Sequence, residues 1–303
     1  MSGGGRARWR RLRGRLTGPI VAALTLLPRG LGWRGAQRLG AGMGRLAWWV
    51  ARRDRRRTLE HLAIAFPELA ERERTRLGRA CFAHFGTTLL ECLRLLGEGC
   101  EEVRRRVAVE GWEGVDALRA SGRQVLILTG HCGNWELLAA TISCHGLPLS
   151  VVARRGQDER LDRLLVSLRQ RFGTTTIARG EAGAARELLR TLRGGGALGM
   201  LIDQDTKVEG AWVPFFGRLA FTPLGAAQIG ARRGVAVVPT FIERQDDGSH
   251  VATFHPPLEL PEDAVEATAL MTRTIEEQVR RRPEQWVWMH RRWRRQPPAA
   301  TTR

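Results

Sequence analysis

The spacing of hydrophobic residues changes near residue 124, and this change predicts two kinds of structure. Between residues 59 and 96 apolar residues recur at helical spacing and Pro67 interrupts them, so we expect two helices there. From residue 124 onward, short apolar runs alternate with amphipathic stretches. The pattern therefore predicts a helical N-terminal part followed by alternating strands and helices.

The alternating part is long enough to define a fold class. Strands are predicted over residues 125–129, 149–153, 174–178, 197–202, 235–242 and 250–255. Helices are predicted from residue 135 and over residues 158–171, 183–193, 224–233 and 264–282. Such alternation predicts an α/β fold with a mixed, mostly parallel central sheet flanked by helices on both faces. In such folds the functional site lies at the carboxyl ends of the strands.

The charge of the chain is concentrated at its ends. The 303 residues carry a formal net charge of +18, and residues 1–15 hold six Arg and no acidic residue. Residues 286–303 hold five Arg, again without an acidic residue. Basic ends suit a partner such as anionic lipid or nucleic acid. Because no nucleic-acid-binding motif accompanies the charge, we expect no nucleic-acid partner.

The first fifty residues combine basic charge with apolar stretches. Residues 16–28 are apolar but are only about half as long as the roughly 20 residues that a spanning helix needs. Residues 31–50 contain three arginines and end in a tryptophan pair. We expect an N-terminal helical, membrane-associating segment at 1–50, interfacial or single-pass, with a signal peptide as the alternative. One domain at 51–296 and a flexible tail at 297–303 follow.

Five cysteines, at positions 81, 92, 100, 132 and 144, lack close or regular spacing. An odd number without a C-x-x-C pair predicts reduced thiols in a cytosol-facing protein rather than a disulfide framework. Two adjacent pairs, His131 with Cys132 and Cys144 with His145, offer four zinc ligands, but their spacing matches none of the common structural zinc patterns. We therefore expect no metal and no cofactor.

The clearest candidate chemistry follows the first predicted strand, in the motif HCGNWE at residues 131–136. His131 directly follows the strand, and Asn134 is a good N-cap that places Glu136 in the first turn of the next helix. A carboxylate that holds one imidazole nitrogen leaves the other free to take a proton from a hydroxyl. A capping histidine beside a solvated glutamate is the alternative. Cys132 is expected to be a bystander thiol, because adjacent side chains point apart.

Other candidate residues follow later strands. Asp203 ends the strand at 197–202, where it is either a ligand for a sugar, a support for an arginine or a turn residue. Phe215 and Phe216 form an apolar loop that either lines a site for an apolar ligand or packs in the core. His290 and Arg291 follow a tryptophan pair, which suits a membrane interface, headgroup phosphates or an acidic protein partner.

Several of these motifs together resemble one family. HCGNWE at 131–136, DQD at 203–205, VPFFG at 213–217 and PEQWVWMHRR at 283–292 are similar to motifs of the bacterial lipid A biosynthesis acyltransferases of the late lauroyl/myristoyl type. This family belongs to the lysophospholipid acyltransferase-like superfamily. The segment AFPEL at 65–69 and Glu91 also match, and the resemblance extends over residues 15–295. His61 departs from the pattern, because members often have Asn before the AFP segment.

The resemblance implies a complete reaction. A fatty acyl chain would pass from an acyl-carrier-protein thioester to a hydroxyl of a glycolipid, a lipid A precursor, at the cytoplasmic face of the inner membrane and beside its anionic lipids. His131 would be the base and Glu136 its partner, without a covalent enzyme intermediate. Arg154 follows the second strand and would lie near them as an oxyanion or phosphate contact.

Arg169 and Arg171 also match family positions, with a solvated helix face as the alternative for each. Two other activities stay open for the same histidine and glutamate. One is acyl transfer to another membrane glycolipid or aminolipid. The other is a lipid thioesterase or hydrolase, in which water replaces the acceptor hydroxyl.

Overall fold

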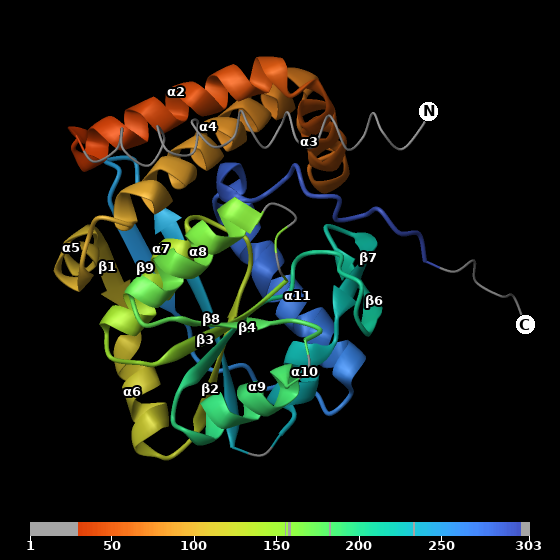
Figure 1. Cartoon of the computed structure of the whole chain (residues 1–303). Helices are drawn as coiled ribbons and strands as arrows, with labels where there is room; N and C mark the ends of the chain where they lie inside the picture. Colours follow the sequence, from red (N-terminus) through yellow and green to blue (C-terminus); the bar gives the residue numbers. More distant parts are fainter. Residues whose placement is uncertain (1–29, 155, 157–158, 182, 233, 298–303) are drawn as a thin grey trace, which may run out of the picture.

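A seven-stranded sheet forms the centre of the molecule (Figure 1). The computed structural model describes residues 30–297 except residues 155, 157, 158, 182 and 233. The strand order is β1-β9-β8-β2-β5-β3-β4, and neighbouring strands are parallel except β8 and β9. The strands are β1 (Val107–Glu110), β2 (Gln124–Thr129), β3 (Leu149–Ala153), β4 (Thr175–Ala178), β5 (Ala197–Leu201), β8 (Val235–Arg244) and β9 (His250–Phe254). This mixed, mostly parallel sheet confirms the predicted fold class.

Helices cover both faces of the sheet, and the alternation of side chains along β2 defines the two cores. Val125 and Ile127 belong to one hydrophobic cluster, whereas Leu126 and Leu128 belong to the other. The first cluster includes residues of α5 (Cys100–Arg106), α6 (Trp112–Ala120), α7 (Trp135–Cys144) and α8 (Glu159–Arg171). The second includes residues of α9 (Ala184–Arg193), α10 (Gly225–Gly230) and α11 (Ala264–Arg281). β2 is therefore buried on both faces, as its continuous apolar run predicts.

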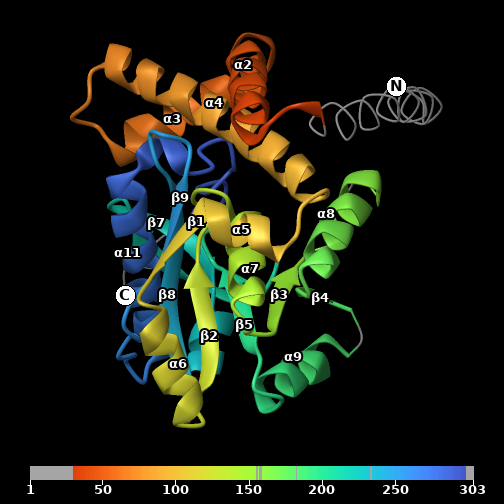
Figure 2. The same cartoon turned by 90° about the vertical axis from the view of Figure 1, so that its left-hand side faces the viewer.

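Three helices lie across the carboxyl ends of the parallel strands (Figure 2). They are α2 (Trp33–Val50), α3 (Arg52–Ala65) and α4 (Glu71–Leu95), and the break predicted at Pro67 separates α3 from α4. The backbones of α2 and α4 touch, because a Cβ atom at Gly44 would lie 2.0 Å from the Phe82 carbonyl oxygen and one at Gly86 would lie 2.1 Å from the Gly40 carbonyl oxygen. Glycine at these positions keeps α2 tightly against α4.

Some elements were not expected. The hairpin of β6 (Gly210–Phe215) and β7 (Arg218–Pro223) lies beside α11, and β1, α5, α6 and the short 3-10 helix η1 (Pro283–Gln285) also escaped the pattern analysis. They are short and half-exposed, so their apolar periodicity is weak. Within the described residues, no helix is long and apolar enough to cross a membrane. Residues 16–28, the apolar stretch of the expected membrane segment, lie outside the described part.

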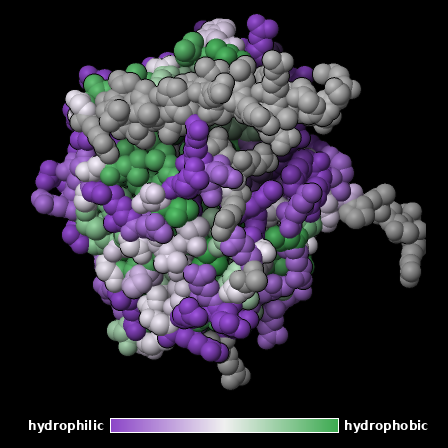
Figure 3. Space-filling view, in the orientation of Figure 1, coloured by the Kyte–Doolittle hydropathy of each residue, from purple (hydrophilic) through white to green (hydrophobic). Residues whose placement is uncertain are grey.

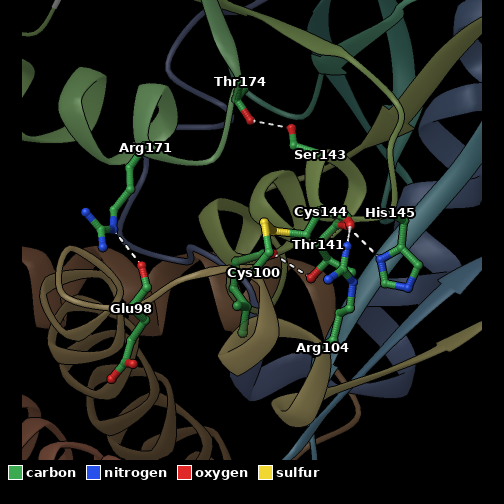
Figure 4. Close-up of a disulfide and its surroundings, with 10 residues drawn as sticks. Glu98, Cys100, Arg104, Thr141, Ser143, Cys144, His145, Arg171 and Thr174 are labelled. Carbon is green, nitrogen blue, oxygen red and sulfur yellow. Dashed lines mark hydrogen bonds between the residues drawn. A yellow bond between two sulfur atoms is a disulfide. The ribbon is translucent and has the colours of Figure 1, made fainter.

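The prediction of reduced thiols was wrong for two of the five cysteines. Cys100 and Cys144 form a disulfide that joins the first residue of α5 to the last residue of α7, with a Cα–Cα distance of 5.3 Å (Figure 4). The other three cysteines are free. The 44-residue separation hid the pair, because only the packing of α5 on α7 brings its members together. Among the described residues, no group of histidines, cysteines and carboxylates is arranged to hold a metal.

Candidate active site

His131 and Asp203 lie side by side because they follow adjacent parallel strands. Thr129 of β2 is in register with Leu201 of β5. His131 and Asp203 each follow two residues later, so they lie beside each other. The Nδ1 atom of His131 lies 2.7 Å from Oδ1 of Asp203, and the backbone N–H of His131 donates to Oδ2 at 2.7 Å. Trp286 Nε1 also donates to Oδ2, at 2.7 Å. The imidazole is thus held from behind by a fixed carboxylate.

The Asp203 carboxylate is ionised at neutral pH although its side chain is only 1% exposed. Burial raises the pKa of Asp203, but the interactions with His131 and the hydrogen bond from Trp286 outweigh burial and lower the pKa to about 2. An ionised carboxylate only accepts hydrogen bonds, so Nδ1 of His131 carries a proton toward it. In the neutral ring, Nε2 is then the basic nitrogen.

Glycine is required on both sides of His131. A Cβ atom at Gly130 would lie 3.1 Å from Oδ2 of Asp203 and 2.9 Å from Ile275 Cγ2. Gly133 has a φ of +61°, and a Cβ atom there would lie 1.9 Å from the carbonyl oxygen of Ile242. The two glycines therefore let the loop after β2 approach the carboxylate and the neighbouring strand closely.

Glu136 does not hold His131, so the pairing expected from the sequence was wrong. Both carboxylate oxygens of Glu136 accept from Arg169, at 2.9 Å from Nε and 2.6 Å from Nη2. Burial lowers the pKa of Arg169, but the bond to Glu136 outweighs that effect and the pKa is raised. Glu136 lies in the first turn of α7, which faces the end of α8 that carries Arg169. This pair links the two helices beside His131.

A buried polar network supports the loop from the opposite side. The side chain of Asn134 caps α7 by accepting from Leu137 N at 3.1 Å, and its Nδ2 donates to Glu91 at 3.0 Å. Glu91 is fully buried and receives two hydrogen bonds from Arg244, at 2.6 and 2.9 Å. Burial raises the pKa of Glu91, but Arg244 and His250 lower it well below its usual range. Glu91 thus stays charged and fixes Asn134.

A pocket of about 480 Å³ opens beside His131. Its polar lining includes Thr88, His131, Glu136, Arg154, Arg169, Arg179, Gln204 and Thr206, and its apolar lining includes Phe85, Leu89, Trp135, Ala139, Leu161 and Leu165. These six apolar residues come from α4, α7 and α8, and residues of β3 and β5 complete the apolar lining. Figure 3, which views the molecule from the side of α8, shows apolar patches among hydrophilic side chains there. The volume and the mixed lining are typical of a site for a ligand with a long apolar part.

Two arginines at this pocket follow adjacent strands. Arg154 follows β3, as expected, and Arg179 follows β4, which is paired with β3. Both side chains line this pocket, and the backbone N–H of Arg179 donates to the carbonyl oxygen of Ala153 at 2.8 Å. Burial and the charge of Arg154 lower the pKa of Arg179. Arg179 was not predicted, although it follows the end of a strand just as Arg154 does.

Arg171 lies elsewhere. Its Nε donates to the carbonyl oxygen of Glu98 at 2.6 Å, and Figure 4 shows it pointing toward the chain that follows α4. It does not line the pocket of His131. Although Arg171 is only two residues from Arg169, the helical turn points the two side chains in different directions.

Phe215 and Phe216 belong to the core, as the alternative interpretation held. They are 0% and 6% exposed. Phe215 packs at 5.4 Å from Trp286, and Phe216 at 5.7 Å from Trp288. Neither lines the pocket of His131, so an acyl chain in that pocket would not touch them.

His290 and Arg291 diverge. His290 is half-buried, and burial lowers its pKa to about 4, with smaller effects from Asp203 and His131. Arg291 is exposed and lines a different cavity, beside α3. Arg292, next in sequence, is fully buried and donates to the carbonyl oxygen of Phe221 at 2.6 Å. The basic run at 290–292 therefore serves three separate places.

Comparisons with known proteins point in one direction. The family model described as bacterial lipid A biosynthesis acyltransferase matches residues 9–295. A lipid A biosynthesis acyltransferase of Haemophilus influenzae is 25% identical over 81% of this chain and 78% of its own length. A lipid A biosynthesis lauroyltransferase of Escherichia coli is 26% identical, covering 88% and 87%. A phosphatidylinositol mannoside acyltransferase of Mycobacterium tuberculosis is 24% identical, covering 71% and 69%.

Proposed function

The chain belongs to the bacterial lipid A biosynthesis acyltransferase family, and from this membership we propose that it transfers a fatty acyl chain from an acyl-carrier-protein thioester to a hydroxyl of a glycolipid of the lipid A precursor type. The observation that carries the proposal is the His131–Asp203 pair, 2.7 Å apart, at the wall of a half-apolar pocket. A base that can accept the proton of an alcohol and a groove for a lipid chain are what this reaction requires.

The proposed chemistry needs one base and no covalent intermediate on the enzyme. Nε2 of His131 takes the proton of the acceptor hydroxyl while the hydroxyl oxygen bonds to the thioester carbonyl carbon. The tetrahedral oxyanion then collapses, the C–S bond breaks, and the imidazolium returns the proton to the leaving thiolate. Asp203 stabilises the imidazolium and keeps the ring oriented.

The oxyanion needs donors close to the reacting carbon. Arg154 and Arg179, at the ends of β3 and β4, give the pocket two adjacent positive charges. We assign Arg154 to the oxyanion or to a phosphate of the donor, with Arg179 beside it. Glu136 neutralises Arg169 and so leaves those two as the arginines of the pocket without a carboxylate partner among the described residues.

The acyl chain of the donor is assigned to the apolar side of the same pocket. Phe85 and Leu89 come from α4, and Leu165 comes from α8. Leu89 is 40% exposed, which is high for a large apolar side chain of a packed helix. Covering such a surface with a fatty chain is favourable because it removes apolar area from water.

The membrane surface is assigned to the end of α2. Leu46, Trp49 and Val50 are 64%, 60% and 74% exposed and are adjacent on that helix. Arg45 and Arg79 flank them, and Arg79 lies 5.4 Å from the Trp49 ring. Exposed apolar residues ringed by arginines suit the boundary of an anionic bilayer, here the cytoplasmic face of the inner membrane.

A second acceptor class has one specific point in its favour. One relative is named as an acyltransferase for phosphatidylinositol mannoside, which is a glycolipid other than lipid A. The donor and the catalytic histidine would be the same for either acceptor. The two acceptors differ in the sugar that must fit beside His131.

The test is a product analysis with acyl-carrier thioesters and both glycolipids. Wild-type protein should yield acylated glycolipid, and His131→Ala should lose at least about 10²-fold in rate because the base is missing. Formation of free fatty acid alone, with or without acceptor, would identify a hydrolase instead. Undiminished transfer by His131→Ala would refute the proposed mechanism.

A further inference from the structure

A second basic cavity, separate from the pocket of His131, lies between α3 and the chain that follows η1. It has a volume of about 320 Å³ and is lined by Arg53, Arg56, Arg57, Glu60, His61, Arg291, Trp293 and Arg294. Figure 1 shows the C-terminal segment, in blue, passing beside α3. The cavity is therefore made by two segments that are more than two hundred residues apart in the sequence.

Specific contacts hold the two segments together. Arg57 Nη1 donates to the carbonyl oxygen of Met289 at 2.9 Å. His61 Nδ1 lies 2.8 Å from the carbonyl oxygen of Trp288, and its ring lies edge-on to Trp293 at 5.1 Å. His61 is only 8% exposed, so it forms the floor of the cavity rather than its rim. The fold thus fixes these basic side chains at one place.

The cavity has a large excess of positive charge. Five arginines line it, and Glu60 is its one carboxylate. Glu60 pairs with Arg56 on the surface at 3.3 Å, and Arg57 and Arg294 bind Asp54 and Asp205. Within the described part of the chain, Arg53 and Arg291 have no ion-pair partner.

Like charges brought together in this way repel one another, and a bound anion would relieve the repulsion. The one carboxylate of the cavity, Glu60, is already paired with Arg56. Arg53 comes from α3 and Arg291 from the C-terminal segment, so each of the two segments that line the cavity contributes one arginine without an ion-pair partner among the described residues.

We propose that this cavity binds a phosphomonoester, and specifically the phosphate on the headgroup of the acceptor glycolipid; this assignment rests on the proposed function. A phosphomonoester carries about −1.5 to −2 charges at pH 7 and three acceptor oxygens. Guanidinium groups match these oxygens in pairs. The indole of Trp293 gives an adjoining sugar ring a flat apolar surface.

The position of the cavity favours the acceptor over the donor. Arg294 and Arg295 bind Asp205, and Arg295 Nη2 donates to the carbonyl oxygen of Thr206 at 3.0 Å. Thr206 lines the pocket of His131, so segment 203–206 separates the two cavities. The donor side of that pocket already has Arg154 and Arg179. A headgroup anchored by its phosphate at α3 would extend past this segment toward His131.

The cavity also lies where a lipid headgroup would be found. Its first arginine, Arg53, is three residues beyond Val50, the last of the exposed apolar residues at the end of α2. A lipid whose chains remain in the bilayer at Leu46 and Val50 could present its headgroup at α3. The acceptor would then reach the site from the membrane while the acyl carrier arrives from the aqueous side.

The direct test measures the binding of inorganic phosphate to the full chain in detergent by isothermal titration calorimetry. The double variant Arg53→Gln/Arg291→Gln should bind about 10- to 100-fold more weakly, because two charge-assisted contacts are lost. The matched control is Arg186→Gln/Arg190→Gln, which removes the same charge from α9 at the opposite end of the molecule (Figure 2). Equal phosphate binding by both double variants would overturn the proposal.

The second test separates the sources of the phosphate. With a phosphorylated acceptor, Arg53→Gln/Arg291→Gln should raise KM about tenfold or more, and this penalty should vanish after phosphatase treatment of the acceptor. The control variant should keep the wild-type KM. A penalty on KM for the acyl-carrier thioester would instead make the cavity a carrier-protein site and refute the assignment.

Bulk phospholipid is distinguished by vesicles. If the double variant loses binding to phosphatidic acid vesicles but keeps its KM for phosphorylated acceptor in detergent, the cavity serves the bilayer and the acceptor assignment fails. If no acceptor is acylated by any form of the protein, the proposed function fails, whereas the phosphate titration still decides whether the cavity binds the anion.

Discussion

Two buried carboxylates flank the loop after β2, and their partners differ. Asp203 binds an imidazole, whose second ring nitrogen can accept a proton from a hydroxyl. Glu136 binds a guanidinium, which stays protonated throughout that range. The Asp203 pair is therefore suited to moving a proton, whereas the Glu136 pair is suited to holding α7 against α8. Both carboxylates are buried, but burial alone does not make them equivalent.

Among changes at the two carboxylates, Asp203→Asn is expected to have the largest effect on the transfer rate. An amide cannot stabilise the imidazolium, and it permits the wrong tautomer of His131. We expect the transfer rate to fall on the order of 10²-fold with the fold retained. Steady-state rates at saturating donor and acceptor, with circular dichroism as the folding control, check this. A rate within a factor of two of wild type would mean that Asp203 does not act through His131.

Glu136→Gln should mainly affect stability. It leaves Arg169 buried beside a neutral partner. Breaking a buried ion pair in this way lowers the free energy of unfolding by about 3–5 kcal/mol. The paired change Glu136→Leu/Arg169→Met should recover most of that loss, because neither charge is then left unpaired. Denaturant unfolding measures the stability, and rates are compared per folded molecule. If Glu136→Gln lowers that rate more than Asp203→Asn does, the roles assigned to the two carboxylates are reversed.

The far end of α7 provides a contrast to its catalytic end. The Cys100–Cys144 disulfide closes a loop across 44 residues, so Cys100→Ser/Cys144→Ser should lower the unfolding free energy by about 2–4 kcal/mol. The transfer rate of the folded protein should stay within about twofold. Dithiothreitol should destabilise wild type and leave the double variant unchanged. A large loss of rate would show that the disulfide end of α7 also positions Glu136.

A smaller effect is expected on the free energy of unfolding, to which Asp203 makes a pH-dependent contribution. The pKa of Asp203 is lowered in the folded state, so its contribution is complete above about pH 4, its unfolded range, and disappears as the pH falls toward 2. The amount is about 2 kcal/mol. Urea unfolding of wild type and Asp203→Asn at pH 5 and pH 3 measures it. The two proteins should lose unequal stability between these pH values, and equal losses would contradict the assignment.

The sequence predicted six of the strands, β2, β3, β4, β5, β8 and β9, and singled out His131, but it did not predict the carboxylate that holds His131. Apolar runs located β2, β3 and β5 to within a residue or two, because buried strands are continuously apolar. Glu136 is five residues from His131, and Asp203 is 72 residues away. Only the β2–β5 register, a tertiary fact, makes the distant residue the neighbour. The same limit hid the Cys100–Cys144 pair and the cavity that α3 forms with the C-terminal segment.

The central claim is that Asp203, and not Glu136, orients the ring of His131. The most direct test is the tautomer of His131, read from the ¹⁵N spectrum of histidine-labelled protein. We expect the Nδ1–H form at neutral pH in wild type, retained in Glu136→Gln and lost or mixed in Asp203→Asn. An unchanged His131 signal in Asp203→Asn, with a changed one in Glu136→Gln, would contradict the central claim.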